Sequence, residues 1–301
     1  MTVERIDFSM LPPATLRKLV ESAASAHGGI LEVGPYVGGS TVALAMGNRG
    51  RVRHAAIEIG GRYMEHPTVP SEDIVADWQR NVERFNFSDA VRLIPGSSYR
   101  YSVRRDAVLH TGKIGLLFVD ADGNIEGTLR AFAPYLLPDA ILVIDDYITD
   151  AAAPKAAKVR PFIDAAISQK LVTENEVIVG TWFGALNGEA AREHLQRLPP
   201  FVPDQDNCYM AYIESYCPAD TLDAPTRSRL CVFEDGLPLG PAHSMHADIR
   251  ESGSGRFSHW DGGATGLSCL FFSSSDNSNP NTNGRRYIVD MGHGPIDLRL
   301  L

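Results

Sequence analysis

The stretch that most constrains the fold of this chain is residues 30–45, ILEVGPYVGGSTVALA. Its apolar start predicts a buried parallel strand, its glycine-rich centre predicts a turn, and Ser40 begins a helical pattern. Such a unit is how α/β proteins hold nucleotides, because the first N–H groups of the helix point at the ligand. The sequence therefore predicts an α/β fold with a ligand at this turn.

The residues of the turn narrow the class of nucleotide. A dinucleotide site needs G-x-G-x-x-G, but Tyr36 stands at the middle glycine and would block a pyrophosphate. A phosphate loop ends in G-K-[ST], and no such lysine is present. The pattern that remains is E-x-G-x-x-x-G, formed by Glu32, Gly34 and Gly38. An acid there repels phosphate but suits a cation, such as the ammonium group of a ligand.

This motif resembles the first motif of class I S-adenosylmethionine-dependent methyltransferases. The likeness is greatest to the catechol and macrocin O-methyltransferases, runs over residues 30–147 and continues weakly to residue 186. It implies a Rossmann-like sheet with helices on both faces and S-adenosyl-L-methionine as cofactor. The cofactor contacts that it implies in the turn are Glu32, Gly34, Tyr36, Gly38 and Ser40.

Two further strand ends complete the predicted cofactor site. A strand over residues 52–59 carries Glu58 near its end, where an acid can accept two hydrogen bonds from a ribose diol. A strand over residues 91–95 precedes Ser97 and Ser98, and the resemblance places this turn beside the adenine. A strand-end glutamate and a plain serine turn are the alternatives.

Acidic residues follow the next two predicted strands, residues 114–119 and 140–144. Adjacent parallel strands lie about 5 Å apart, so carboxylates at both ends converge and repel one another. A hard divalent cation such as Mg²⁺, Mn²⁺ or Ca²⁺ relieves that repulsion. The resemblance implies that Asp120, Asp145 and Asp146 bind Mg²⁺, which would lower the pKa of the acceptor oxygen. The alternative is a set of loop acids in a metal-free methyltransferase.

The resemblance is incomplete at the position of the general base. Catechol-type enzymes have a lysine three residues after the first metal ligand, and here that position is Gly123. Macrocin-type enzymes have a second acid two residues after that ligand, which makes Asp122 the candidate base, with a turn aspartate as the alternative. Tyr147 and Lys155 are candidate substrate contacts, and residues 149–170 are expected to form a helix broken near Pro161.

The last third of the chain differs in composition. A proline-rich segment at residues 198–203 separates a methyltransferase domain, residues 1–198, from a β-rich module, residues 204–301. Short β runs between turns predict a small sandwich or roll that could bind substrate or carbohydrate. The candidate sugar-binding stretches are residues 255–260, which end in Trp260, and the polar run from Asp276, although turn residues and a core tryptophan explain these stretches as well. His243, His246 and His259 suggest a metal site, but structural roles are commoner.

Bulk properties exclude several classes of protein. A net charge of −9 argues against a nucleic-acid partner, and no apolar run approaches the length of a membrane span, about 20 residues. The N-terminal sequence has no signal-peptide pattern, and the four cysteines form no C-x-x-C pair, which fits reduced thiols in the cytoplasm. A homodimer is a candidate assembly.

The function that these features favour is O-methylation of a small-molecule hydroxyl, with a saccharide or glycosylated metabolite as first choice. A metal-dependent glycosyltransferase could use Asp120-Ala121-Asp122 as a D-x-D motif, but Glu32 and Glu58 would then face phosphates. A non-catalytic carbohydrate-binding or scaffolding protein is the alternative from a different class.

Overall fold

The computed structural model describes residues 2–148, 155–196, 201–213, 218–261, 268–290 and 295–297. The chain forms two compact units, residues 1–98 with 102–198 and residues 99–101 with 199–301. Residues 198–200 of the predicted linker, residues 149–154 of the predicted helix and Cys217 lie outside the described residues.

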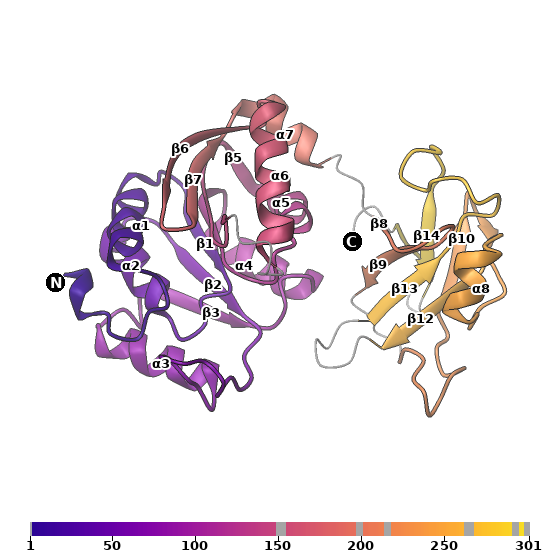
Figure 1. Cartoon of the computed structure of the whole chain (residues 1–301), viewed down its shortest axis with the longest axis horizontal. Coiled ribbons are helices and arrows are strands. Elements are labelled where there is room, and N and C mark those ends of the chain that lie inside the picture. The colour runs from indigo at the N-terminus through magenta and orange to yellow at the C-terminus, as the bar shows by residue number, and fades with distance from the viewer. Residues whose placement is uncertain are drawn as a thin grey trace. The chain divides into compact units, whose positions relative to one another are not determined.

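The first unit contains a seven-stranded sheet of order β3-β2-β1-β4-β5-β7-β6 (Figure 1). The first five strands are parallel, and β7 and β6 are antiparallel additions that form a hairpin at the end of the sheet. The strands are β1 (Gly29–Val33), β2 (His54–Glu58), β3 (Val91–Pro95), β4 (Ile114–Val119), β5 (Leu136–Ile144), β6 (Val172–Ile178) and β7 (Thr181–Leu186).

Helices cover both faces of this sheet, as the Rossmann-like prediction requires. One hydrophobic core joins the sheet to α1–α3, and a second core joins its other face to α4–α7. Alternate residues of one strand serve the two cores: Ile30 packs with α1–α3, and Leu31 packs on the opposite side. The helices are α1 (Pro13–Ser25), α2 (Gly39–Asn48), α3 (Ile74–Arg84), α4 (Tyr101–Thr111), α5 (Ile125–Phe132), α6 (Ala156–Ser168) and α7 (Gly188–Gln196).

Two sequence-based boundaries were wrong, and proline is involved in both. The sequence pattern of residues 125–136 predicts a helix, but α5 ends at Phe132, a 3-10 turn follows, and β5 already begins at Leu136. Pro134 has no N–H to continue the helix. By contrast, Pro161 does not break α6, because it lies in the second turn and removes one backbone hydrogen bond only.

The second unit is a small β-sandwich, one of the two predicted forms. Its four-stranded sheets have the orders β11-β10-β14-β15 and β12-β13-β9-β8. Leu270 and Phe272 of one sheet share a core with Val232 and Val289 of the other. Its elements are β8 (Val202–Pro203), β9 (Tyr209–Ile213), β10 (Cys231–Glu234), β11 (Leu237–Pro238), α8 (His246–Glu251), β12 (Phe257–Asp261), β13 (Ser268–Phe272), β14 (Tyr287–Asp290) and β15 (Pro295–Asp297).

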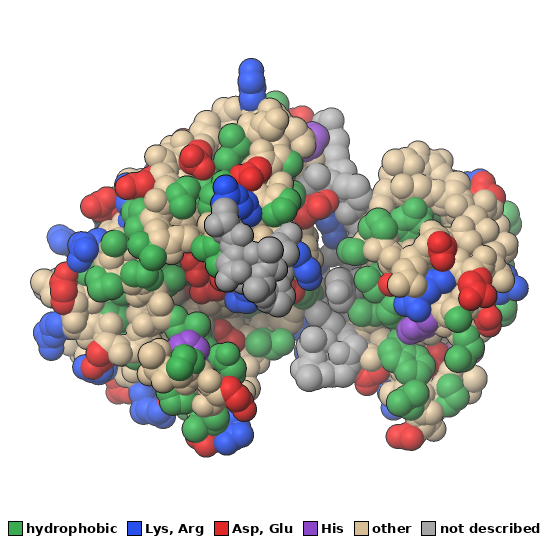
Figure 2. Space-filling model, viewed as in Figure 1, with side chains coloured by type: hydrophobic (Ala, Val, Ile, Leu, Met, Phe, Trp, Pro, Cys, Tyr) green, Lys and Arg blue, Asp and Glu red, His purple; other side chains and the backbone are tan. Residues whose placement is uncertain are grey.

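Acidic and basic side chains are interspersed over the faces of both units that Figure 2 shows. Among the described helices, none is both long enough and apolar enough to span a bilayer.

Candidate functional site

The carboxyl ends of five neighbouring strands form one continuous edge, because each strand-end backbone bonds to the next strand. Every predicted ligand-binding turn of the first unit is therefore brought to this edge. The four connecting hydrogen bonds run from Gly96 N to Glu58 O (2.8 Å), Gly34 N to Ile57 O (3.0 Å), Asp120 N to Val33 O (2.9 Å) and Asp145 N to Val119 O (3.0 Å).

The glycine turn between β1 and α2 packs directly against the acidic turn after β4. Gly34 has a φ of +85°, and a Cβ there would lie 2.0 Å from the Asp120 carbonyl oxygen. Gly38 has a φ of +93°, and a Cβ there would meet the Trp78 ring at 3.0 Å. Tyr36 also has a positive φ, 52°, which is uncommon for a tyrosine. The two predicted motifs are thus one packed unit.

Glu32 lies inside the protein beneath this turn. It is fully buried, and its two carboxylate oxygens accept hydrogen bonds from the hydroxyls of Ser40 (2.5 Å) and Thr41 (2.6 Å) at the start of α2. Burial raises its pKa to about 7, against the effect of the two hydroxyls. Glu32 therefore fixes the strand to the helix and shapes the turn from within.

Glu58, at the end of β2, fixes the other side of the turn. Its carboxylate accepts the backbone N–H groups of Tyr36 and Gly60, both at 2.9 Å, and only 5% of its surface is exposed. Burial raises the pKa of Glu58, although these N–H groups act in the opposite direction. Glu58, the residue predicted to bind the ribose, thus lies at the edge of the sheet beside the glycine turn.

Ser97 and Ser98 follow β3 at the same edge, next to Glu58. Ser97 is buried, and the Ser98 carbonyl accepts a hydrogen bond from the Arg104 guanidinium at 3.1 Å. Arg104 itself is only 8% exposed, so an arginine that the helical pattern leaves to solvent instead supports this turn.

Asp120, Asp145 and Asp146 converge as the sequence predicts. One carboxylate oxygen from each lies within 4.8 Å of the others. Burial and the neighbouring Asp145 raise the pKa of Asp120, and burial raises that of Asp145. Thr181, at the start of β7, donates its hydroxyl to Asp145 at 2.5 Å. The sequence pattern did not indicate Thr181, because its partner is 36 residues away.

Lys155, just before α6, also reaches this cluster. Its ammonium nitrogen lies 3.5 Å from Asp120 Oδ1 and 3.3 Å from Asp146 Oδ2. Tyr147, the other candidate substrate contact, donates its hydroxyl to Asp164 at 2.5 Å. Lys155 therefore contacts the acidic cluster, whereas the Tyr147 hydroxyl is bound to Asp164 of α6.

Asp122 is an exposed residue of the turn after β4. Its side chain is exposed, and its Oδ1 accepts the backbone N–H of Asn124 at 3.1 Å, which is turn geometry. The oxygens of Asp120 group with Asp145 and Asp146, and Asp122 is not a member of that group. The D-x-D motif of a glycosyltransferase is therefore not supported by the arrangement.

The three histidines of the second unit have separate partners. Buried His259 lies between the hydroxyls of Ser228 (2.7 Å) and Ser268 (2.8 Å). His243 pairs with Asp220 at 2.7 Å, and His246 stacks on Phe271 with ring centroids 4.0 Å apart. Within the described residues they do not gather into a metal site, which agrees with structural roles.

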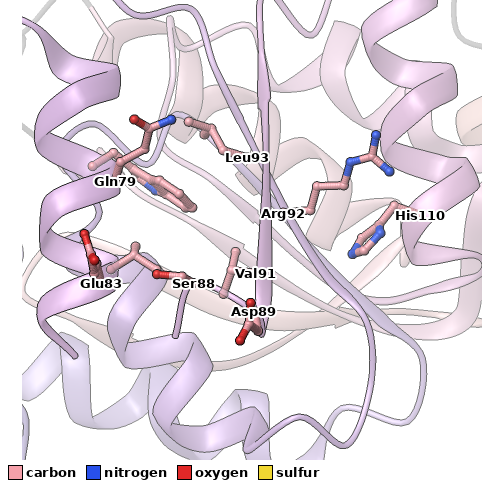
Figure 3. Close-up of a pocket in the computed structure, with 10 residues that line it drawn as sticks. Gln79, Glu83, Ser88, Asp89, Val91, Arg92, Leu93 and His110 are labelled. Carbon is pink, nitrogen blue, oxygen red and sulfur yellow. The ribbon is translucent and has the colours of Figure 1, made fainter. Parts of the chain in front are cut away.

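A hollow of the first unit lies beside α3 and the edge strand β3, away from the strand ends (Figure 3). Glu83 and Asp89 lie on one side, and Arg92 and His110 lie on the other. These charges are mixed, and none of the predicted site residues lines the hollow. We therefore place the candidate site at the strand ends.

Comparison with known proteins gives a domain assignment. Residues 31–147 match the family described as "Methyltransferase domain". A search of curated proteins finds no match. Among solved structures, the O-methyltransferase from Bacillus cereus in complex with SAH is 17% identical over 61% of this chain and 90% of that chain, with a TM-score of 0.47. TomG, an O-methyltransferase from Streptomyces achromogenes in complex with SAM, is 19% identical over 60% and 83%, with a TM-score of 0.46. Cofactor-bound Rv0187 from MTB is 17% identical over 62% and 87%, with a TM-score of 0.47.

The domain match, and not these distant likenesses, carries the assignment. It begins within β1 and ends just after the acids that follow β5, so it covers every residue predicted to bind the cofactor or Mg²⁺, and Asp122 as well. The enzyme class predicted from the first motif is confirmed at this level: residues 31–147 of this chain are a methyltransferase domain.

Proposed function

We propose that the protein transfers a methyl group from S-adenosyl-L-methionine to a hydroxyl oxygen of a small molecule, assisted by a divalent cation. The observation that carries this proposal is the direct packing of the glycine turn on the acidic turn. Gly34 lies against the carbonyl of Asp120, so a donor held by one turn lies beside an acceptor held by the other. Proximity of that kind is a main source of rate in transfer reactions.

The donor site follows from the strand ends. Glu58 is proposed to accept the ribose hydroxyls, and Ser97 or Ser98 to contact the adenine. The turn from Gly34 to Ser40 would hold the amino-acid end. Glu32 would hold this turn in shape and not contact the ligand directly, because both of its oxygens already accept hydrogen bonds from hydroxyls of the protein.

The side chains of the acidic cluster are suitable ligands for Mg²⁺, since they are three carboxylates and hard cations prefer oxygen ligands. When bound to Asp120, Asp145 and Asp146, the cation would lower the pKa of the acceptor hydroxyl. Asp122 is our candidate to accept the proton, because its exposed carboxylate follows Asp120 by two residues. The S–CH₃ bond breaks as the O–CH₃ bond forms, which leaves S-adenosylhomocysteine and the methylated oxygen.

A labelled-donor assay tests the proposal. Methyl-labelled S-adenosylmethionine is incubated with a panel of sugars, glycosylated metabolites and phenols, with and without EDTA. We expect transfer that EDTA abolishes and Mg²⁺ restores. Asp122→Asn should reduce the rate about 100-fold or more if Asp122 is the base.

Asp139→Asn is the matched control, because Asp139 belongs to β5 but is exposed at the opposite end of the strand from Asp145. It should keep the wild-type rate. Transfer that is insensitive to EDTA would remove the cation from the mechanism. Stabilisation of the protein by a UDP-sugar and not by S-adenosylmethionine would contradict the proposed donor.

A saccharide or glycosylated metabolite stays our first prediction for the acceptor, with the β-sandwich as the proposed accessory module. The assay panel decides between sugars and phenols. A cytoplasmic location and a homodimer also stay predictions.

A further inference from the structure

Lys155 is held at the acidic cluster by the packing of its own backbone. Gly123, in the turn after β4, has a φ of +83°, and a Cβ there would lie 3.3 Å from the Cα and from the carbonyl oxygen of Lys155. The start of α6 therefore lies close against the acidic turn. From this position the ammonium group approaches Asp120 at 3.5 Å and Asp146 at 3.3 Å.

The partners within the cluster are divided between two donors. Thr181 binds Asp145, whereas Lys155 contacts Asp120 and Asp146. Two side chains that are distant in the sequence, Thr181 and Lys155, therefore serve all three carboxylates. The hydroxyl of Thr181 is neutral, so Lys155 is the group in these contacts that brings a positive charge.

The charges explain why this contact matters for a cation. When all three carboxylates are ionised, they and the ammonium group together have a net charge of −2. The cluster therefore still attracts a divalent cation, but the ammonium group repels that cation at short range. It also contacts one oxygen each of Asp120 and Asp146, so it competes with the cation for these two carboxylates.

We propose that Lys155 is a tethered counter-ion that competes with the divalent cation for Asp120 and Asp146, and so sets the metal affinity of the cluster. This inference rests on the metal site of the proposed function. It gives Lys155 a positioning role: the ammonium group keeps the acids together without the cation and leaves them when the cation binds.

Binding of Mn²⁺ to the full-length protein, followed by the electron paramagnetic resonance signal of the free ion, tests the proposal without an activity readout. Lys155→Met removes the charge and keeps an unbranched side chain. We expect it to bind Mn²⁺ about tenfold more tightly than the wild type, or better. Lys155→Arg keeps the charge and should bind no more tightly than the wild type.

Lys158→Met is the matched control, since Lys158 is exposed on the same helix. It should leave Mn²⁺ affinity unchanged. Thermal unfolding in EDTA gives a second readout. Lys155→Met should melt at a lower temperature than the wild type, because its acids lack their counter-ion, and Mn²⁺ should restore more stability to it than to the wild type.

Equal or weaker Mn²⁺ binding by Lys155→Met would overturn the competition and leave the metal site standing. Absence of Mn²⁺ binding in every variant would overturn both the competition and the metal assistance. Calorimetry with S-adenosylhomocysteine on the same samples then decides whether the donor site still stands, so the two failures are distinguishable.

Discussion

Each unit of this protein surrounds acidic side chains with polar groups, but with opposite electrostatic results. In the second unit, buried Glu234 receives hydrogen bonds from Ser275, Tyr287 and Arg285. Burial works to raise its pKa, yet these donors lower it. In the first unit, Asp120 lies beside Asp145 and Asp146, and burial together with Asp145 raises its pKa despite Lys155.

This contrast indicates which unit uses its buried acids for stability and which uses them for function. Glu234 has donors for both of its oxygens and its charge is matched, so its network holds the sandwich together. The Asp120 cluster is crowded with like charges, an arrangement that costs stability unless a ligand uses it. The first unit is therefore the place to expect chemistry, and the second unit is the place to expect structural polar groups.

The largest expected effect comes from Gly34→Ala. The new methyl group would lie 2.0 Å from the Asp120 carbonyl oxygen, and the backbone would keep a φ of +85° that alanine disfavours. We expect binding of S-adenosylhomocysteine, measured by calorimetry, to weaken at least about 100-fold, the effect of roughly 3 kcal/mol of misfit.

Gly50→Ala is the control that separates the effect of backbone strain from the effect of displacing the glycine turn. Gly50 also has a positive φ, 73°, but a Cβ there meets nothing within 4 Å. This variant should lose some stability and keep its affinity for S-adenosylhomocysteine. If both variants bind equally well, the packing of the two turns does not build the site.

Neutralising one acid in each unit should change stability in opposite directions. Asp120→Asn removes a crowded charge, so the first unit should gain about 1 kcal/mol at pH 8 in EDTA. Glu234→Gln leaves Arg285 without its buried carboxylate, so the second unit should lose roughly 1–3 kcal/mol. Peptide-resolved hydrogen exchange in increasing urea reports on each unit separately.

Asp276→Asn is the control for the second unit, because Asp276 also pairs with Arg285 but is exposed. Its effect should be smaller than that of Glu234→Gln. A loss of stability in Asp120→Asn equal to that in Glu234→Gln would contradict the contrast between the units.

The last expected effect is a change in the pH dependence of stability, which is small at any single pH near neutrality. The pKa of Glu32 is about 7 in the folded protein against 4.5 for an ordinary glutamate. Between these values the folded state holds the extra proton, so its contribution is full below pH 4.5 and is lost as pH rises through 7. Glu32→Gln should make the decline in the first unit's free energy of unfolding shallower by up to about 1.4 kcal/mol per pH unit.

Hydrogen exchange at several pH values measures this slope. Glu83→Gln, on the exposed surface of α3, should keep the wild-type slope. A Glu32→Gln protein with an unchanged slope would mean that Glu32 is ionised throughout.

The parallel sheet and its strand ends could be predicted because the signals are local. Residues 30–45 contain a strand, a turn and a helix start in one run, and the acids follow apolar strands directly. Carboxyl ends of parallel strands share an edge, so the convergence of Asp120 with Asp145 followed from topology alone.

The partners of these residues could not be predicted, because they come from distant segments. The contacts of Thr181 with Asp145 and of Lys155 with Asp120 depend on where β7 and α6 pack. The burial of Arg104, which is only 8% exposed, likewise depends on tertiary packing that a helical sequence pattern does not show.

The most direct test of the central claim is a crystal structure with S-adenosylhomocysteine and a divalent cation. The account predicts the ribose at Glu58, the homocysteine along the turn from Gly34 to Ser40, and the sulfur facing a cation held by Asp120, Asp145 and Asp146. A strand-end edge that stays empty at saturating ligand, or that binds a diphosphate instead, would contradict it.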